Sequence, residues 1–310
     1  MLRQSPGVLT LAILAACTAM PPPRIASQSA DELMGPAEFR SLPSRPADHR
    51  IAYGDDPNQY ADLSVPSTAG PHPVVILIHG GCWKADYATL RGLAPMADAL
   101  KADGIASWNI EYRRIPQPGS GWPGTYADVG RATDHLRVIA QKYRLDLDRV
   151  VVLGHSAGGH LAMWVAARSR LPAKSQLHVA DPLPISGVVD LAGAGDLEAF
   201  IPVQMTACRD PNIVKTLLGG EPAAAPERYA QTSAMRMLPL AKRQILIWGQ
   251  RDEMTPVWLG EAYADAARKA GDSVRLEVLP SLGHFEIADP ASPAWPVVHE
   301  AIGSLLKPGH

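Results

Sequence analysis

The stretch that decides the fold is Val150-Val-Val-Leu-Gly-His-Ser-Ala-Gly-Gly-His160. It begins with four apolar residues, three of them β-branched, which predict a buried strand. The strand breaks into a G-x-S-x-G motif at 154–158, and the run from Gly159 to Arg168 predicts a helix. A strand, a sharp turn and a helix in this order are the context in which such a motif presents a nucleophilic serine.

The residue types of the motif suit that chemistry. A serine hydroxyl is a weak nucleophile, so Ser156 must project from a tight turn to reach both a base and a substrate. Glycines two residues before and after Ser156 remove the side chains that would collide in the turn. The N–H group of Ala157, at the start of the helix, then points at a developing oxyanion. The alternative is a glycine-bearing turn with an incidental serine, and the rest of the chain decides between the two.

The composition fits one large or two small globular domains. The chain has 310 residues, of which 46% are hydrophobic and 19% charged, with a net charge of -2. No long basic run is present, so a nucleic-acid partner is not expected. The sequence has no H-E-x-x-H or C-x-x-C spacing and no Walker or dinucleotide glycine pattern, so neither a metal nor a cofactor is expected.

Residues 1–17 have the pattern of an export signal. Arg3 and the amino terminus supply positive charge, and the apolar stretch from Val8 to Ala16 is too short to span a bilayer. The stretch ends in Leu14-Ala-Ala-Cys17, which resembles the lipobox of bacterial lipoproteins. The resemblance implies a lipid on Cys17 and a place in the bacterial cell envelope, either membrane-anchored or periplasmic. The alternative is an ordinary secretory signal that is cut a few residues later.

Composition also divides the rest of the chain. Residues 18–47 are rich in Pro, Ser and Ala without periodicity, which predicts a flexible tether to a body at 48–310. The body alternates apolar strand patterns with helical ones, which predicts an α/β fold with one doubly wound, mainly parallel sheet and helices on both faces. About fifty residues, 191–241, lack a clear strand and predict a short cap insertion over a site.

The first strand pattern of the body, at 59–65, alternates polar and apolar residues and suggests an antiparallel strand at a sheet edge. Continuous apolar runs indicate the other strands, which are covered on both faces. These strands are expected at 73–78, 105–110, 150–153, 183–189, 244–248 and 273–279, and helices at 89–102, 126–143, 159–168, 257–269 and 295–306.

A base and an orienting acid for Ser156 are found past later strands. Asp252 follows the strand at 244–248, and His284 follows the strand at 273–279. The chain order Ser, Asp, His is that of one known arrangement of the catalytic triad, and strand ends on one edge of a parallel sheet lie close together. Taken alone, Asp252 could equally be a loop carboxylate or a helix cap, and Glu253 is the second choice for the orienting acid. The alternative for His284 is a surface loop residue.

A second motif, His79-Gly-Gly-Cys-Trp83, follows the strand at 73–78. Two glycines let backbone N–H groups approach a substrate carbonyl, so Gly81 and Cys82 join Ala157 as candidates for the oxyanion hole. The alternative is a simple turn at a strand end. His79 is expected to be structural, and so are His155, inside the G-x-S-x-G motif, and His160, on the helix that follows.

Cys82 and Cys208 are the cysteines outside the export signal. An exported chain meets an oxidising compartment, so a bridge between them is one outcome, and two free, partly buried thiols are the favoured alternative. The aromatic residues Trp83, Trp122, Trp258 and Phe285 lie near strand ends, but aromatic residues serve packing first, and none is chosen as a binding residue.

On these motifs the chain resembles the α/β-hydrolase family, in particular its esterase/lipase and kynurenine-formamidase-like branch. The blocks that carry the resemblance are His79–Trp83, Gly154–Leu161, Asn109–Arg114 with Gly121–Thr125, and the pair Asp252 and His284. The resemblance spans roughly residues 50–306. It implies hydrolysis of a small-molecule ester or similar acyl bond through an acyl-enzyme, with Ser156 attacking, His284 moving the proton and Asp252 holding the imidazole.

Other activities of such folds stay open at this point. Formamidases of this branch often have a tyrosine where this chain has Cys82, which favours a carboxylesterase over an arylformamidase. An exported peptidase of the prolyl-oligopeptidase type is a further alternative, although no propeller pattern precedes the body. A non-catalytic envelope-binding lipoprotein is the last one, because a fold does not fix a function.

Overall fold

The computed structural model describes Met1 and residues 32–307. The expected export signal at 1–17, the lipid attachment at Cys17 and the first half of the expected tether lie outside the described residues, Met1 apart. Among the described residues, no helix combines the length and the apolar character that crossing a bilayer demands.

The frame of the molecule is an eight-stranded sheet in the order β1-β2-β4-β3-β5-β6-β7-β8. Strands β3 to β8 pair in parallel, whereas β2 runs opposite to its neighbours β1 and β4. The predicted mainly parallel, doubly wound sheet is therefore confirmed. The strands are β1 (His49–Ala52), β2 (Tyr60–Ser64), β3 (His72–Ile78), β4 (Ala106–Ile110), β5 (Leu145–His155), β6 (Gly187–Leu191), β7 (Arg243–Gly249) and β8 (Val274–Leu279).

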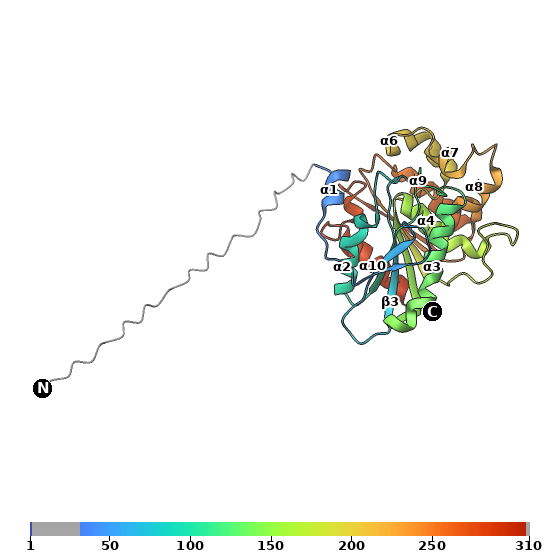
Figure 1. Cartoon of the computed structure of the whole chain (residues 1–310). Coiled ribbons are helices and arrows are strands. Elements are labelled where there is room, and N and C mark those ends of the chain that lie inside the picture. Colours follow the sequence, from blue (N-terminus) through green and yellow to red (C-terminus); the bar gives the residue numbers. More distant parts are fainter. Residues whose placement is uncertain (2–31, 308–310) are drawn as a thin grey trace. The chain divides into compact units, whose positions relative to one another are not determined.

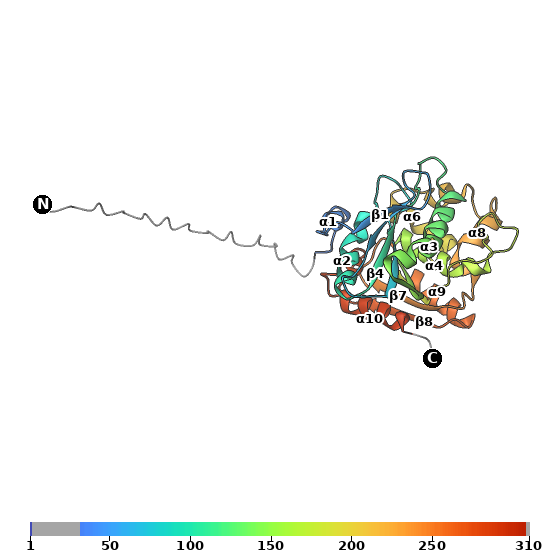
Figure 2. The ribbon, with the colours of Figure 1, turned by 60° about the horizontal axis from the view of Figure 1, so that its bottom comes forward.

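Helices cover both faces of this sheet (Figures 1 and 2). Helices α2 and α10 pack on one face, and α3, α4 and α9 pack on the other. Figure 1 shows α6 and α7 at the same end of the sheet as α1. The α-helices are α1 (Pro36–Ser41), α2 (Ala94–Ala102), α3 (Gly124–Tyr143), α4 (Ala157–Ala167), α5 (Leu197–Phe200), α6 (Gln204–Cys208), α7 (Ile213–Leu218), α8 (Pro226–Thr232), α9 (Val257–Lys269) and α10 (Trp295–Leu306).

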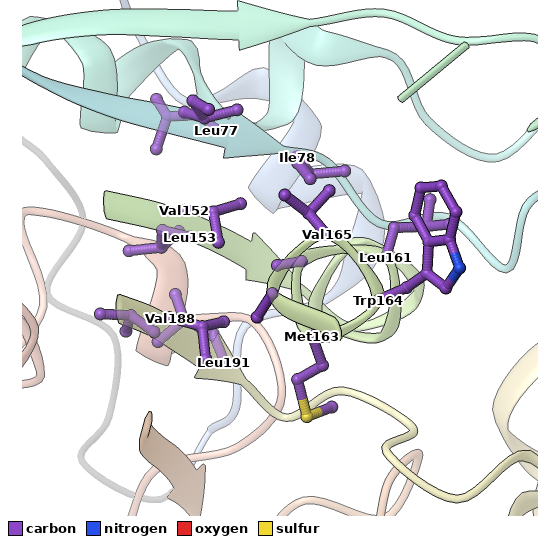
Figure 3. Close-up of a cluster of buried hydrophobic side chains, with 14 of the residues drawn as sticks. Leu77, Ile78, Val152, Leu153, Leu161, Met163, Trp164, Val165, Val188 and Leu191 are labelled. Carbon is purple, nitrogen blue, oxygen red and sulfur yellow. The ribbon is translucent and has the colours of Figure 1, made fainter. Parts of the chain in front are cut away.

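Helix α4, which follows the central strand β5 directly, lies within the core. All of its residues are buried, as expected for a helix that is apolar on every side. Figure 3 shows Leu161 and Val165 of α4 among side chains of the neighbouring strands, including Ile78 of β3 and Val152 of β5. Since these side chains have no exposed surface or close to none, the start of α4 is held firmly against the sheet.

Three expectations about element boundaries are corrected by the structure. The strand at 59–65 is not at the edge, because β1 pairs outside it. The strand expected at 183–189 begins only at Gly187, since Pro182 and Pro184 have no N–H group to donate to a ladder. The expected tether does not reach residue 47, because α1 packs on the body and its Phe39 is only 7% exposed.

Candidate active site

The nucleophile candidate lies on a strained turn between β5 and α4. Ser156 has φ 56° and ψ -122°, a backbone conformation that is costly for a residue with a side chain and is concentrated at functional sites. Both motif glycines are required by close approach. A Cβ atom on Gly154 would lie 2.0 Å from the Gly158 carbonyl oxygen, and one on Gly158 would lie 2.0 Å from the Ile78 carbonyl oxygen. The sequence G-x-S-x-G is therefore what allows the turn to be this tight.

Loops from the carboxyl ends of four strands meet around a cleft of about 460 Å³. The loop after β3 contributes Gly80–Cys82, the turn after β5 contributes Ser156, and the loops after β7 and β8 contribute Met254 and His284. This is the edge of a parallel sheet at which ligands of such folds bind. Candidates that lie up to 203 positions apart, from Gly81 to His284, thus share one cavity.

The structure joins the two other triad candidates directly. The Nδ1 atom of His284 lies 2.6 Å from Oδ2 of Asp252, and both side chains are buried. Asp252 also accepts hydrogen bonds from the backbone N–H groups of Met254 and Thr255 and from the Thr255 hydroxyl. The reserve candidate Glu253 is exposed. The acid therefore fixes the orientation of the imidazole, whose other nitrogen is left for chemistry in the cleft.

The electrostatics of the pair keep the acid ionised. Burial alone would raise the pKa of Asp252, but the charge of the His284 imidazole and the hydrogen bonds from His284 and Thr255 outweigh burial and hold the pKa below its ordinary value. A carboxylate in this position stabilises the imidazolium that forms when His284 takes up a proton. The pair can thus act as a base that is oriented and electrostatically supported.

The oxyanion candidates lie on the turn after β3 and at the first residue of α4. Gly81, Cys82 and Trp83 all have positive φ angles, of 102°, 52° and 55°. The turn brings Gly81 and Cys82 to the cleft wall beside Ser156. Ala157 begins α4, so its N–H group has no acceptor within the helix. The arrangement offers backbone N–H donors from two sides of the nucleophile.

A buried ionic network supports the turn after β3. The Nε2 atom of His79 lies 2.9 Å from Oε1 of Glu111, and Arg114 pairs with the same carboxylate at 3.2 Å. Burial would raise the pKa of Glu111, but the His79 ring and Arg114 hold it below its ordinary value. The hydroxyl of Tyr112 donates to the carbonyl oxygen of His79 at 2.8 Å. His79 thus acts on the turn through hydrogen bonds, and Glu111 is a support that the sequence reasoning did not single out.

The two histidines that flank the nucleophile are buried and neutral. Burial lowers the pKa of His155 to about 3 and that of His160 to about 4. The Nε2 atom of His155 donates to the carbonyl oxygen of His284 at 2.9 Å, and His160 donates to the carbonyl oxygen of Thr232 at 3.0 Å. His155 therefore ties the turn that holds Ser156 to the loop that holds His284.

Several residues of the cleft were missed by sequence reasoning. Phe39 and Arg40 of α1 line it, with Tyr87 from the loop after β3 and Thr206 and Arg209 at α6. The ring of Phe39 lies 5.2 Å from the ring of Phe285, itself part of the cleft wall. No pattern in 18–47 marks Phe39 as part of a site, because a single helical turn is too short to show a period.

A second, much smaller hollow of about 10 Å³ borders the same serine. Its wall shares Cys82 and Met254 with the cleft and adds Trp83 and Phe200. The residues that line this hollow do not include His284, which faces the larger cleft. Ser156 therefore borders two spaces, a wide one that His284 also lines and a tight one that His284 does not line.

The two cysteines form a disulfide. Cys82 and Cys208 are bonded, with Cα atoms 5.8 Å apart, so the expectation of two free thiols is wrong. The bond joins the turn after β3 to helix α6, across 126 positions of sequence. Sequence alone could not show it, because the separation says nothing about distance in the fold. Within the described residues, no group of three or more His, Cys, Asp or Glu side chains is arranged to hold a metal ion.

The sheet order, the serine on a strained turn after β5 and the acid–base pair after β7 and β8 define the α/β-hydrolase class. Within that class, the family model named BD-FAE matches residues 61–265. The chain belongs to the BD-FAE family, which is a family of α/β-hydrolase esterases. The resemblance noted in the sequence motifs is thereby confirmed.

Relatives of known name are esterases. Esterase LipC of Mycobacterium tuberculosis is 28% identical over 282 residues, which is 84% of this chain and 65% of the relative. Esterase LipQ of the same organism is 28% identical over 254 residues, which is 76% of this chain and 55% of the relative. The chain thus spans somewhat under two thirds of the length of these curated relatives.

Solved structures share the fold. Esterase B of Lactobacillus rhamnosis superposes with a TM-score of 0.73 and 21% identity, covering 86% of this chain and 89% of that one. A truncated carbohydrate esterase from gut microbiota has a TM-score of 0.69 and 20% identity, covering 88% of this chain and 99% of that one. At these identities the likeness establishes the architecture.

Proposed function

We propose that this protein hydrolyses carboxylic esters, with Ser156 as nucleophile, His284 as base and Asp252 as the acid that orients the base. The observation that carries the proposal is the 2.6 Å contact between His284 and Asp252 at a cleft that Ser156 also lines. A nucleophile, a base within its cavity and a buried acid behind the base are the groups that acyl transfer needs.

The reaction follows from these groups. The Oγ atom of Ser156 bonds to the ester carbonyl carbon while His284 takes the hydroxyl proton, and the carbonyl oxygen becomes an oxyanion that faces the N–H groups of Gly81, Cys82 and Ala157. Collapse of this intermediate breaks the bond to the alcohol oxygen, to which His284 returns the proton. Water then attacks the acyl-enzyme by the same route and releases the carboxylic acid.

The two spaces beside Ser156 indicate how an ester is oriented. The alcohol oxygen must lie within reach of His284, so the alcohol occupies the cleft of about 460 Å³ that His284 lines. The acyl substituent then points toward the hollow of about 10 Å³, which holds roughly one water-sized group. We infer a preference for short acyl groups and tolerance for large alcohols.

Names among the compared proteins agree with an ester substrate. LipC and LipQ are named esterases, and one structural neighbour is titled an acetyl ester-xyloside bifunctional hydrolase from Caldicellulosiruptor lactoaceticus. These names describe those proteins, and they support the choice of esters with short acyl groups as first substrates for this one.

The direct test compares the protein with its Ser156→Ala variant on p-nitrophenyl acetate, butyrate and hexanoate. In an unrelated triad enzyme, loss of the nucleophile lowers turnover on the order of a millionfold, so we expect loss of activity to the background rate. Capture of Ser156 by a fluorophosphonate probe checks the nucleophile without a chosen substrate. Equal hydrolysis by both proteins, or no hydrolysis and no labelling, refutes the proposal.

We also propose that the chain is exported and anchored in the cell envelope through a lipid on Cys17. The support is the sequence pattern of residues 1–17, with its short apolar run and lipobox-like end. The test is the distribution between membrane and soluble fractions of the producing cell. We expect the Cys17→Ser variant to be lost from the membrane fraction, and unchanged partitioning would contradict lipid attachment.

A further inference from the structure

The loop after β3 is joined at three points to helix α6 of the cap and the residues that directly follow it. The disulfide between Cys82 and Cys208 is the first. The hydroxyl of Tyr87 donates to the carbonyl oxygen of Cys208 at 2.7 Å, and Nζ of Lys84 lies 4.0 Å from the carboxylate of Asp210. Two segments that are distant in sequence are therefore held together by one covalent bond and two polar contacts.

The turn needs such support because its backbone is strained. Cys82 and Trp83 are not glycines, yet both have φ angles above 50°. Such conformations are costly for residues with a side chain and persist only where the surroundings impose them. On the side of the sheet, the carbonyl oxygen of Trp83 accepts from the N–H group of Ile115 at 2.8 Å. On the side of the cap, the covalent bond at Cys82 is the strongest restraint among the described contacts.

The same bond forms part of the wall of the small hollow beside Ser156, which is proposed to receive the acyl group and is called the acyl hollow below. Cys82, Ala207 and Cys208 all line the space of about 10 Å³, together with Trp83 of the same turn and Phe200 of α5. Both cysteines are almost fully buried, at 5% and 1% exposure. The position of α6 against the turn therefore sets how much room is left beside Ser156.

We propose that the Cys82–Cys208 disulfide is a positioning and specificity element of the site. It holds the N–H group of Cys82 where the oxyanion forms, and it keeps α6 close enough to exclude long acyl groups. The cap is consequently fixed to the oxyanion turn and does not open independently of it. This inference rests on the proposed ester hydrolysis.

The test removes the bond in the full chain with Cys208→Ala, which leaves every backbone N–H group in place. With p-nitrophenyl acetate we expect kcat to fall at least tenfold, and by no more than the roughly 10²–10³-fold that loss of a whole oxyanion donor causes. We expect KM to change less than threefold. The ratio of kcat/KM for hexanoate to that for acetate should rise at least threefold, because the hollow widens.

Two controls separate positioning from general damage. Met205→Ala changes an exposed residue of the same helix, 56% exposed, and keeps the bond, so its kinetics should match those of the parent protein. If Cys208→Ala does not fold, as judged by near-ultraviolet circular dichroism, reduction of the folded parent by a phosphine provides the second measurement. In that step the disulfide gains two electrons and two protons to become two thiols, and the phosphine becomes its oxide with oxygen from water. Reoxidation of the reduced protein must restore the kinetics of the parent.

The outcomes distinguish this inference from the proposed function. A parent protein that neither hydrolyses esters nor reacts with a fluorophosphonate refutes the function itself. A parent that does both, alongside a bond-free protein whose kcat and acyl-chain ratio stay within twofold of the parent, refutes only the inference. A rise in KM at unchanged kcat would also overturn it, since that result assigns the bond to ground-state binding.

Discussion

The inner and outer halves of the site are built by different means. The inner half consists of the turn at Ser156, the pair Asp252 and His284 and the turn after β3, and its side chains are locked by buried hydrogen bonds. The outer half consists of α1 and α6, which contribute mainly contact surface such as Phe39 and Ala207.

This difference shows which part of the site needs accurately positioned groups and which part needs only a suitable volume and surface. Catalysis requires that the reacting groups be positioned to within a fraction of an ångström. Buried charged groups with several hydrogen-bond partners hold them there. Selection among substrates requires only volume and apolar surface, which Phe39 of α1 supplies. Polar contacts tie this segment to the body: the N–H group of Met34, just before α1, donates to Glu286 at 2.5 Å, and Arg40 of α1 donates to the Tyr87 carbonyl oxygen at 3.2 Å. Changes in the inner half should therefore alter kcat. Changes in the outer half should alter substrate choice, except at Cys208, whose bond reaches the inner half at Cys82.

The largest effect should come from Asp252→Asn. The amide keeps the shape of the carboxylate but not its charge, so it neither fixes the tautomer of His284 nor stabilises the imidazolium. The same change in another serine-triad enzyme lowers kcat about 10⁴-fold, and we expect a loss of roughly that size with KM little changed. Glu253→Gln, at the neighbouring exposed position, is the matched control and should retain full activity. Comparable losses in both variants would argue against Asp252 as the orienting acid.

A smaller effect is expected from Glu111→Gln, which weakens the network behind the oxyanion turn. Removal of one partner from a buried ion pair typically costs about 3–5 kcal/mol of unfolding free energy, and Arg114 would be left without its carboxylate. We expect kcat to fall about tenfold, since the turn loses part of its restraint, and denaturant melts to report the loss of stability. The control is Glu300→Gln, which breaks an exposed pair with Arg275 and should cost under about 1 kcal/mol. If Glu111→Gln melts like the control, the buried network is not what holds the turn.

In the outer half, Phe39→Ala should change selectivity rather than turnover. An aromatic contact adds about 0.5–1.5 kcal/mol, so we expect KM for an aryl acetate to rise about two- to tenfold, while KM for ethyl acetate stays nearly constant. Phe200→Leu, in the wall of the acyl hollow, should instead shift the acyl-chain profile. Identical profiles for the two variants would remove the division of the site into an alcohol side and an acyl side.

The smallest effect on turnover is expected from Asp190→Asn, behind the nucleophile helix. Asp190 is fully buried at the end of β6 and accepts the Gly193 N–H group at 2.9 Å. Burial raises its pKa from 3.8 to about 8, so the folded carboxyl stays protonated after the unfolded one has ionised. The stability from this group is therefore full below pH 4 and is lost as the pH rises toward 8.

The measurement for Asp190 is the unfolding free energy of parent and variant between pH 4 and 8. Their difference should change by up to about 1.4 kcal/mol per pH unit, in favour of Asp190→Asn at the higher pH, with near-parental kcat. A difference that does not depend on pH would show that this carboxyl is ionised in the fold. That result would place a buried charge, instead of a neutral support, inside the inner half.

The inner half could largely be predicted from the sequence, and the outer half could not. The turn at Ser156 is encoded locally, because its glycines and apolar strand leave one workable geometry. Asp252 and His284 follow from the rule that parallel strands end at one edge. The chosen residues are brought to one site, although their catalytic roles stay predictions until they are measured.

What the sequence did not reveal depends on contacts between distant segments. Phe39 belongs to one helical turn in a stretch rich in Pro and Ser, and only the position of Phe285 makes it part of a wall. The bond between Cys82 and Cys208 depends on where α6 comes to lie, and Glu111 matters only because β4 runs beside β3. Such features follow from tertiary packing, which local patterns do not encode.

The disulfide has a consequence for the chain when it is not folded. It closes a covalent ring that runs from α2 through β4, α3, β5, α4 and β6 to α5 and α6, with Ser156 inside it and Asp252 and His284 outside. In the chain-entropy account, a ring of about 100 residues removes enough conformational freedom from the unfolded chain to favour folding by about 4–5 kcal/mol. That is comparable to the whole stability of many domains. The disulfide therefore reduces the number of conformations that are open to the unfolded chain, in which no strand of the sheet is formed.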